Sequence, residues 1–309
     1  MTTSPSVSST AATANLLCIV SMLIWAAGLP AAELIIPLIP PLPMTALRTG
    51  LAATVLMAVW IAVEGTGTVR RANWGQGIVV GGICIGLGAL FVVIGQAYTD
   101  AVTVAIITAS IPLIGIGLEL TLDGRKLTLP LVLGLILSLS GGLIALAQGG
   151  FGLDLGLGAL ATFASCLAFT WGSRATVKSF PGMTPLGRTS LTVTGAFIAS
   201  ATLALAWAAL GGPAVQWDGI GPKEFGALLL FGIGSLAVSQ ILWIIGVERI
   251  GIGAASLHMN AVPFYVMIFA FAFGADWNWL QAFGAVIVVI GVLVAQDMIR
   301  LPSTRLSGK

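Results

Sequence analysis

Residues 95–112 read GQAYTDAVTVAIITASIP, and residues 246–263 read GVERIGIGAASLHMNAVP. The two stretches align, and the alignment continues into the segments that follow them. Four pairs mark it: Gly95 with Gly246, Pro112 with Pro263, Gly134 with Gly284, and Gly141 with Gly291. The first two pairs are 151 residues apart and the last two are 150 apart. Because the chain has 40 glycines, one match means little, but four matches in order indicate an internal repeat.

The composition of the chain is that of a membrane protein. Of 309 residues, 58% are hydrophobic and 8% are charged, and the mean hydropathy is +1.06. A soluble domain carries about 25% charged residues, so this chain has too few to cover a surface in water. The net charge of +2, with no basic run longer than Arg70-Arg71, argues against nucleic acid as a partner.

Ten stretches of the chain are apolar and long enough to cross a bilayer, which takes roughly 20 residues. They lie near residues 14–35, 44–63, 77–97, 101–120, 128–148, 156–176, 186–209, 225–247, 252–273 and 279–297. The connections between them are short and rich in Gly and Pro, as in the segments 37–43 and 65–67. The sequence therefore predicts an all-α polytopic membrane protein without a separate soluble domain.

The basic residues orient these ten predicted spans. Ten of them follow even-numbered spans: Arg70, Arg71, Arg125, Lys126, Arg174, Lys178, Arg249, Arg300, Arg305 and Lys309. The opposite connections hold only Lys223. Because cytoplasmic loops are enriched in Lys and Arg, we predict a multi-pass protein of the inner (plasma) membrane with both termini cytoplasmic. Residues 1–12 are expected to form a disordered tail and residues 299–309 a cytoplasmic one.

The repeat divides the chain into two halves, residues 13–149 and 153–298, each with five predicted spans. Five is an odd number, so the second half crosses the bilayer in the opposite sense to the first. Inverted repeats recur in secondary transporters, whose substrate site lies near the middle of the membrane between the repeats. The architecture therefore predicts a transporter that works by alternating access.

Two further features are shared by the halves. Each has a tryptophan in its first span, Trp25 or Trp171, and an arginine early in its second, Arg48 or Arg188. Each also has a fourth span marked by Gly and Pro, a short polar turn and a Gly-rich fifth span. In these features the chain resembles the drug/metabolite transporter superfamily, and best the ten-span EamA type, over roughly residues 14–297. The resemblance implies that fold and a transport function, and amino-acid exporters belong to this type.

The proline and tryptophan residues of the repeat are candidates for the cavity. Pro112 and Pro263 disturb the helical hydrogen-bond ladder, and such breaks in transporters often lie at the substrate cavity. A kink that serves only packing is the alternative. Trp25 and Trp171 suit a cavity that stacks an apolar substrate, although buried aromatic side chains more often serve packing.

Polar residues of the ninth span are further candidates. His258 and Asn260 stand where the first repeat has Ile107 and Ala109, so the fold tolerates apolar residues there. Two positions are about 200° apart on a helix, so both cannot share a face. We predict that Asn260, on one stripe with Ser256, contacts the substrate, and that His258 lies beside it in a supporting or proton-sensing place. A hydrogen bond to a neighbouring helix is the alternative for Asn260.

Additional candidates lie on the third and eighth spans and at the external mouth of the bundle. The third and eighth spans contribute Tyr98, Ser239, Gln240 and Trp243. Arg48 either extends outward to the membrane surface or meets a substrate carboxylate there.

The sequence offers little for catalysis, metal binding or proton coupling. Cys18, Cys84 and Cys166 are far apart and form no C-x-x-C pair, so we expect neither metal nor cofactor. The 11 carboxylates all fall in loops or near span ends, which favours a facilitator or exchanger over a proton-driven pump. A serine–histidine membrane enzyme using His258 and a membrane scaffold are the alternatives from other classes.

The predicted function is export of small amphiphilic metabolites, with amino acids, including aromatic ones, as the leading substrates. A nucleotide-sugar, sugar-phosphate or drug transporter of the same fold is the alternative. The expected partners are a small-molecule substrate and the lipid bilayer, and a monomer is compatible with the sequence.

Overall fold

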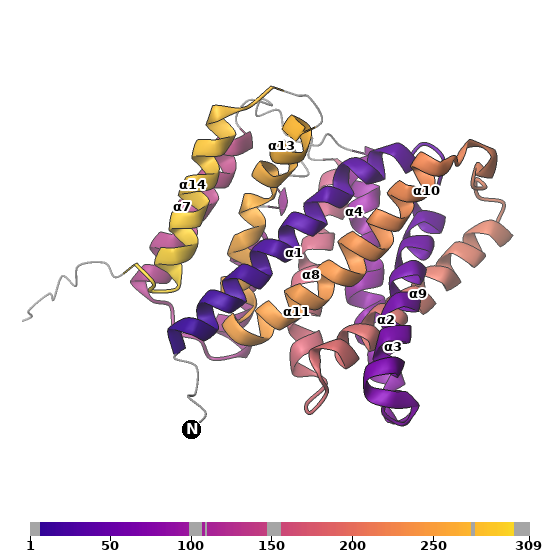
Figure 1. Ribbon diagram of the computed structural model, residues 1–309, viewed down its shortest axis with the longest axis horizontal. Helices are drawn as coiled ribbons and strands as arrows, with labels where there is room; N and C mark the ends of the chain where they lie inside the picture. The colour runs from indigo at the N-terminus through magenta and orange to yellow at the C-terminus, as the bar shows by residue number, and fades with distance from the viewer. Residues whose placement is uncertain (1–6, 99–106, 109, 147–155, 273–275, 300–309) are drawn as a thin grey trace, which may run out of the picture.

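The computed structural model describes residues 7–98, 107–108, 110–146, 156–272 and 276–299, and its regular secondary structure there is entirely helical (Figure 1). The first half contains α1 (Val7–Ile35), α2 (Pro41–Arg71), α3 (Trp74–Val80), η1 (Gly81–Gly86), α4 (Leu87–Tyr98), α6 (Ile111–Leu122) and α7 (Leu129–Leu146). The segments α3, η1 and α4 run on without a break, as one long apolar helix.

The second half contains an equivalent series. It consists of α8 (Leu157–Lys178), α9 (Pro185–Ala209), the turn η3 (Trp217–Gly219), α10 (Pro222–Leu229), η4 (Leu230–Val238), α11 (Ser239–Ile250), α12 (Ile252–Ser256), η5 (Leu257–Ala261), α13 (Val262–Ala272) and α14 (Trp279–Ala295). Six stretches of the described residues are long and apolar enough to span a membrane, and three shorter apolar helices accompany them. The predicted all-α membrane fold is confirmed, whereas the orientation of the termini stays a prediction.

Two helix boundaries differ from those expected. Helix α1 begins at Val7, inside the stretch 1–12 that we expected to be a disordered tail. Ala11 and Ala12 are strong helix formers, and the apolar span that follows extends the helix back through them. Helix α2 likewise continues beyond the expected connection at 65–67, with a single break at Gly65 (φ 80°), where glycine adopts the left-handed region without strain.

The two halves pack according to the repeat. Helix α7 packs against α14 and α2 against α9, so equivalent helices meet each other, while α4 packs on α8 and α11 on α1. Two of the glycine pairs that reveal the repeat, Gly134 with Gly284 and Gly141 with Gly291, lie in the first of these contacts. A β-carbon on Gly134 would collide with the carbonyl oxygen of Gly291, and one on Gly141 with that of Gly284. Small residues let helices approach where lipid gives no hydrophobic drive, so these four glycines hold the halves together.

The α1–α11 and α8–α4 contacts are copies of each other. Ser21 of α1 donates a hydrogen bond of 2.7 Å to the carbonyl oxygen of Ser239, and Ser165 of α8 donates one of 2.8 Å to that of Gly88. The acceptors are 151 residues apart in sequence, and the donors are 144 apart. The first spans therefore align at a shorter offset than the third and fourth spans.

This offset corrects the predicted equivalence of Trp25 and Trp171. At 144 residues the counterpart of Trp25 is Phe169, and Trp171 lies two positions further along α8. Two positions place Trp171 on another face of the helix, where it is 39% exposed. The prediction matched two rare residues by identity, whereas the fold repeats an aromatic ring at one position.

Both long central helices contain a π-helical segment at equivalent places, η1 in the first half and η4 in the second. A π-helical turn widens the helix and re-aims the side chains around it, and such segments concentrate at functional sites. Here η1 packs against α8 and α9, and η4 packs against α1 and α2.

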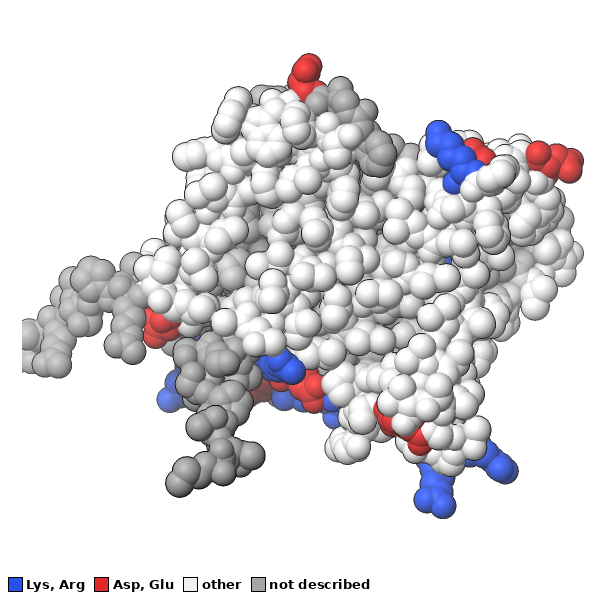
Figure 2. Space-filling model, in the orientation of Figure 1, with Lys and Arg blue, Asp and Glu red and all other residues white. Residues whose placement is uncertain are grey.

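On the face that Figure 2 shows, charged side chains gather at the two ends of the bundle, and the surface between them is almost entirely uncharged. We call the end at which α1 begins and at which α2, α8 and α11 finish the N-terminal end (Figure 1). The uncharged middle of the molecule is the part that matches the hydrocarbon layer of a bilayer.

Candidate functional site

A cavity of about 100 Å³ lies between the two halves. Side chains of α1, α2, η1, α4, α6, α8, η4, α11 and η5 line it, together with Thr108. The site is therefore built from both repeats, at the place where inverted-repeat transporters bind their substrates.

Five positions of the long central helix line this cavity in each repeat. The pairs, each 151 residues apart, are Cys84 and Ser235, Ile85 and Leu236, Gly88 and Ser239, Ala89 and Gln240, and Val92 and Trp243. Equivalent positions of the two repeats thus face the same cavity. The first half presents small or apolar side chains and the second presents two hydroxyls, an amide and an indole, so the two walls differ in chemistry.

Arg48 brings a positive charge to this cavity. Its side chain is 6% exposed, and its Nε donates a hydrogen bond of 3.2 Å to the carbonyl oxygen of Phe231 in η4. One terminal nitrogen is 3.4 Å from the hydroxyl of Ser235, and the guanidinium carbon is 4.0 Å from the centre of the Phe231 ring. These contacts direct Arg48 toward the other half. They do not support the predicted alternative in which Arg48 extends outward to the membrane surface.

Three aromatic rings form part of the wall: Trp25, Phe169 and Trp243. The rings of Phe169 and Trp243 are 5.7 Å apart between centres, and the indole nitrogen of Trp243 donates a hydrogen bond of 2.9 Å to Ser173 Oγ. Aromatic walls of this kind bury large apolar area while the bonded indole stays in one orientation.

Five of the predicted site residues line the cavity: Trp25, Arg48, Ser239, Gln240 and Trp243. Tyr98 does not, because it stands in the last turn of α4 and is 64% exposed. Trp171 does not either, for the reason given above. Pro112 occupies the first turn of α6, where a proline displaces no hydrogen bond, so it starts a helix instead of kinking one.

The ninth-span candidates are buried but face away from the cavity. Residues 257–261 form a 3₁₀ turn, so their side chains do not follow the α-helical stripes that we assumed. Asn260 Nδ2 donates a hydrogen bond of 3.0 Å to Ser138 Oγ in α7, which is the helix-contact alternative. His258 Nδ1 is 3.0 Å from the carbonyl oxygen of Ala255, and Ser256 donates to that of Gly253.

Met259, between His258 and Asn260, is the residue of this turn that lines the cavity. Pro263 is the second residue of α13, and its side chain lies outside the described residues. The expectation that Asn260 contacts substrate therefore has no support in the geometry, because its amide lies against α7.

Most of the lining residues were not predicted from the sequence. The missed residues are the five repeat-related positions of the first half, Ser235 and Leu236 of the second half, and Met22, Thr108, Ile111, Thr162, Ser165, Cys166, Phe169 and Met259. The repeat itself held a usable signal, since subtracting 151 from Ser239, Gln240 and Trp243 gives three positions of the opposite wall. The small and apolar residues otherwise resemble any packed helix face.

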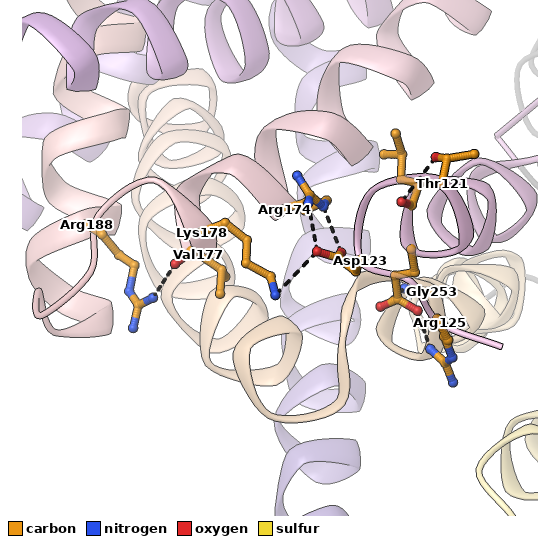
Figure 3. A network of polar contacts seen from close by, with 10 residues as sticks. Thr121, Asp123, Arg125, Arg174, Val177, Lys178, Arg188 and Gly253 are labelled. Atoms are coloured by element: carbon orange, nitrogen blue, oxygen red, sulfur yellow. Dashed lines mark hydrogen bonds and ion pairs between the residues drawn. The ribbon is translucent and has the colours of Figure 1, made fainter.

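A network of charged side chains joins the two halves at the N-terminal end (Figure 3). Asp123, which follows α6 in the first half, accepts hydrogen bonds of 2.8 and 2.7 Å from Arg174 of α8 in the second half. Lys178 adds an ion pair at 3.4 Å. The hydrogen bond from Arg174 holds the pKa of the Asp123 carboxyl below its ordinary value, so this bridge is intact at neutral pH.

Further polar contacts join helices at the same end. Glu119 of α6 accepts a hydrogen bond of 3.1 Å from the backbone nitrogen of Gly253 and pairs with Arg125. Asn15 and Gln296 exchange hydrogen bonds of 2.6 and 2.7 Å, which join α1 to the end of α14. A pocket of about 330 Å³ at this end is lined by charged side chains, namely Glu119, Asp123, Arg125, Arg174, Lys178 and Glu248. Val247, one turn of α11 beyond Trp243, lines it, so a thin layer of side chains separates it from the cavity.

Among the residues that the structure describes, no three His, Cys, Asp or Glu side chains come together as metal ligands would. The cysteines Cys18, Cys84 and Cys166 are buried and free, and Cys84 and Cys166 belong to the cavity wall. The described cavity wall combines one cation with hydroxyls, an amide and aromatic rings.

Comparison with known proteins gives concordant matches. The sequence profile of the EamA-like transporter family matches residues 12–147 and 156–295, one match in each half. The chain is 30% identical over 268 residues to the uncharacterized transporter YyaM of Bacillus subtilis (strain 168), covering 85% of this chain and 86% of that protein. It also superimposes on a crystal structure with a TM-score of 0.78 and 23% identity, over 94% of this chain and 98% of that one, which shows the shared fold.

Proposed function

The chain belongs to the EamA-like transporter family of the drug/metabolite transporter superfamily, and we propose that it exports small amphiphilic metabolites, with amino acids as the leading class. The observation that carries this proposal is the cavity between the halves. Its wall combines one buried cation, Arg48, with hydroxyl and amide groups and three aromatic rings. Such a wall is complementary to a small solute with a polar head and an apolar or aromatic tail.

Transport by alternating access fits the placement of the polar network. We propose that the protein lies in the inner (plasma) membrane with the N-terminal end cytoplasmic, as the excess of Lys and Arg there favours. Release and rebinding of substrate at that end then require the contacts of Asp123 with Arg174 and of Glu119 with Gly253 to open. Both contacts join one half to the other, so rocking of the halves would break them together.

The lining favours a facilitator or exchanger. No Asp or Glu belongs to the described cavity wall, and an intramembrane acid is the usual means of coupling transport to protons. His258 is buried behind the wall, where it bonds to the backbone of its own turn. We therefore expect movement of substrate down its own gradient or against a second solute.

The alternatives carry less support. Nucleotide sugars and sugar phosphates bear several negative charges, whereas Arg48 is the one charged residue of the described wall. A serine–histidine enzyme is excluded by the family, whose members transport their substrates without converting them. A drug-like apolar substrate would offer no negative charge to pair with Arg48 in the cavity wall.

Counterflow in proteoliposomes tests the proposal. Vesicles containing the purified chain are loaded with an unlabelled solute, and uptake of labelled amino acids and nucleosides is measured with and without a pH gradient. We expect accumulation of at least one amino acid above that in vesicles without protein, independent of the gradient. Absence of uptake for every solute would contradict transport, and uptake that needs the gradient would contradict the facilitator or exchanger.

A further inference from the structure

Two buried arginines occupy matching places in the repeats but have different partners. Arg48 and Arg188 each begin an Arg-Thr-x-Leu sequence near the start of the second span of their half, residues 48–51 and 188–191. Their side chains are 6% and 5% exposed. Because a charge inside a membrane protein is costly without a partner, each of them should be compensated.

Arg188 has its compensation within its own half. It pairs with the carboxylate of Glu248 in α11 and donates a hydrogen bond of 3.0 Å to the carbonyl oxygen of Val177 in α8. In the second half, the arginine at this repeat position is therefore paired with a carboxylate near the end of the third span.

The first half lacks that carboxylate. At the offset of 151 residues, the counterpart of Glu248 is Ala97. Among the side chains that the structure describes, no carboxylate pairs with Arg48, whose contacts are the Phe231 carbonyl oxygen, the Phe231 ring and the Ser235 hydroxyl. These neutral groups hold the guanidinium in place at the cavity wall without neutralising it.

We propose that a substrate carboxylate takes the place of the missing glutamate, so that Arg48 is the anion-binding group of the cavity and the substrates are monocarboxylates with an apolar tail. This inference rests on the proposed function and names its substrate class. Guanidinium binds a carboxylate through two parallel hydrogen bonds, and a wall with few competing waters strengthens that pair. Binding of the substrate carboxylate would give Arg48 an ion pair like the one that Arg188 makes with Glu248.

The rest of the wall specifies the tail and not the amino group. Trp25, Phe169 and Trp243 offer apolar contact, while no acid of the described wall can compensate an ammonium. Carboxylates that lack an amino group therefore bind, amino acids bind through the same carboxylate, and amines with the same tails do not.

Ligand binding to the purified full-length chain in detergent tests this inference without any transport step. The probes are acids and amines that share a tail: propyl, 3-methylbutyl, 2-phenylethyl and 2-(indol-3-yl)ethyl. Isothermal titration calorimetry gives the affinity, and ligand-induced shifts of the melting temperature give an independent estimate. We expect at least one acid to bind more than about tenfold more tightly than its matched amine.

Three variants locate the anion-binding group. Arg48→Gln should weaken binding of the acid by about tenfold or more, and Arg48→Lys, which keeps the charge but not the planar fork, should weaken it less. Arg70→Gln, an exposed arginine outside the cavity, is the matched control and should leave binding unchanged. Melting temperatures without ligand report whether each variant is folded, and the acid–amine comparison on the native chain does not depend on them.

Three results would overturn the inference: no acid binds, amines bind as tightly as acids, or folded Arg48→Gln binds the acid as the native chain does. Its failure is distinguishable from that of the proposed function. Counterflow of solutes without a carboxylate would refute the anion site while transport stands. Acid binding that depends on Arg48, without movement of any solute, would refute transport while the anion site stands.

Discussion

The indole nitrogen of Trp243 donates a hydrogen bond of 2.9 Å to the hydroxyl of Ser173, and this bond ties α11 to α8 between the cavity and the polar pocket of the N-terminal end. Trp243 is 1% exposed and Ser173 is 2% exposed. The two side chains belong to the layer that separates the cavity from that pocket.

Loss of the Ser173 hydroxyl should destabilise the packing of α11 against α8. Ser173→Ala leaves the buried indole donor without its partner, which costs about 1–3 kcal/mol, whereas Trp243→Phe removes the donor itself. We expect Ser173→Ala to lower the melting temperature in the native chain and to have little effect in the Trp243→Phe background. A double-mutant cycle on thermal unfolding in detergent measures this coupling, and equal effects in both backgrounds would contradict it.

The contact of α7 with α14 should tolerate no side chain at Gly134. The β-carbon of Gly134→Ala would meet the backbone of Gly291, and overpacking of this kind costs about 1–3 kcal/mol. Gly117→Ala is the matched control, because a β-carbon there meets no atom within 4 Å. We expect a lower melting temperature for the first variant and no loss for the second. Equal stability of the two variants would show that the halves can separate at this contact without penalty.

The Asp123 bridge should weaken in acid. The pKa of Asp123 in the folded protein is below its unfolded value of about 3.9, so the bridge adds stability above that pH and loses it as pH falls through the folded pKa. A bridge at this partly exposed site contributes up to about 1 kcal/mol. The melting temperature of Asp123→Asn should therefore fall below that of the native chain at pH 7, and the difference should shrink below about pH 4.

A second aspartate provides the control for that titration. Asp218, in the turn η3, is exposed and has no ion pair among the described residues. Asp218→Asn should follow the native chain at every pH. A constant difference between Asp123→Asn and the native chain from pH 7 to pH 3.5 would mean that the bridge is not what the aspartate contributes.

Two substitutions that copy the first repeat should separate the cavity wall from its surroundings. Gln240→Ala copies Ala89 and removes an amide from the wall, so we expect substrate affinity to fall about three- to tenfold. Asn260→Ala copies Ala109 and removes the bond to Ser138, which should cost about 0.6 kcal/mol of stability without a change in affinity. Binding and melting measurements on both variants check this, and loss of affinity in Asn260→Ala alone would restore the sequence-based assignment.

Much of the architecture was predictable because the membrane imposes it. A chain in lipid must satisfy its backbone hydrogen bonds within helices, so hydropathy predicts helices and their approximate limits. Aligned glycines and prolines predicted the repeat, and two of the glycine pairs, Gly134 with Gly284 and Gly141 with Gly291, lie where α7 and α14 meet. Close packing is visible in the sequence because equivalent positions of both halves need a glycine at the same contact.

The site was predictable only in part, because a cavity depends on which side chains converge from distant helices. Gln240 and Trp243 were identified as polar or aromatic exceptions in apolar helices, and both line the wall. Asn260 was an equally clear exception, yet the 3₁₀ turn at 257–261 directs its amide to α7 and brings the inconspicuous Met259 to the cavity.

The sequence by itself determined that this is a helical membrane protein of two related halves, because hydropathy and the aligned glycines and prolines depend only on the order of residues along the chain. The structure alone decided that Trp25 corresponds to Phe169, that both π-helical segments contribute side chains to the cavity wall, and that Arg48 faces the other half while Arg188 pairs with Glu248. The physical reason is that each of these outcomes depends on how helices rotate and pack against partners remote in sequence.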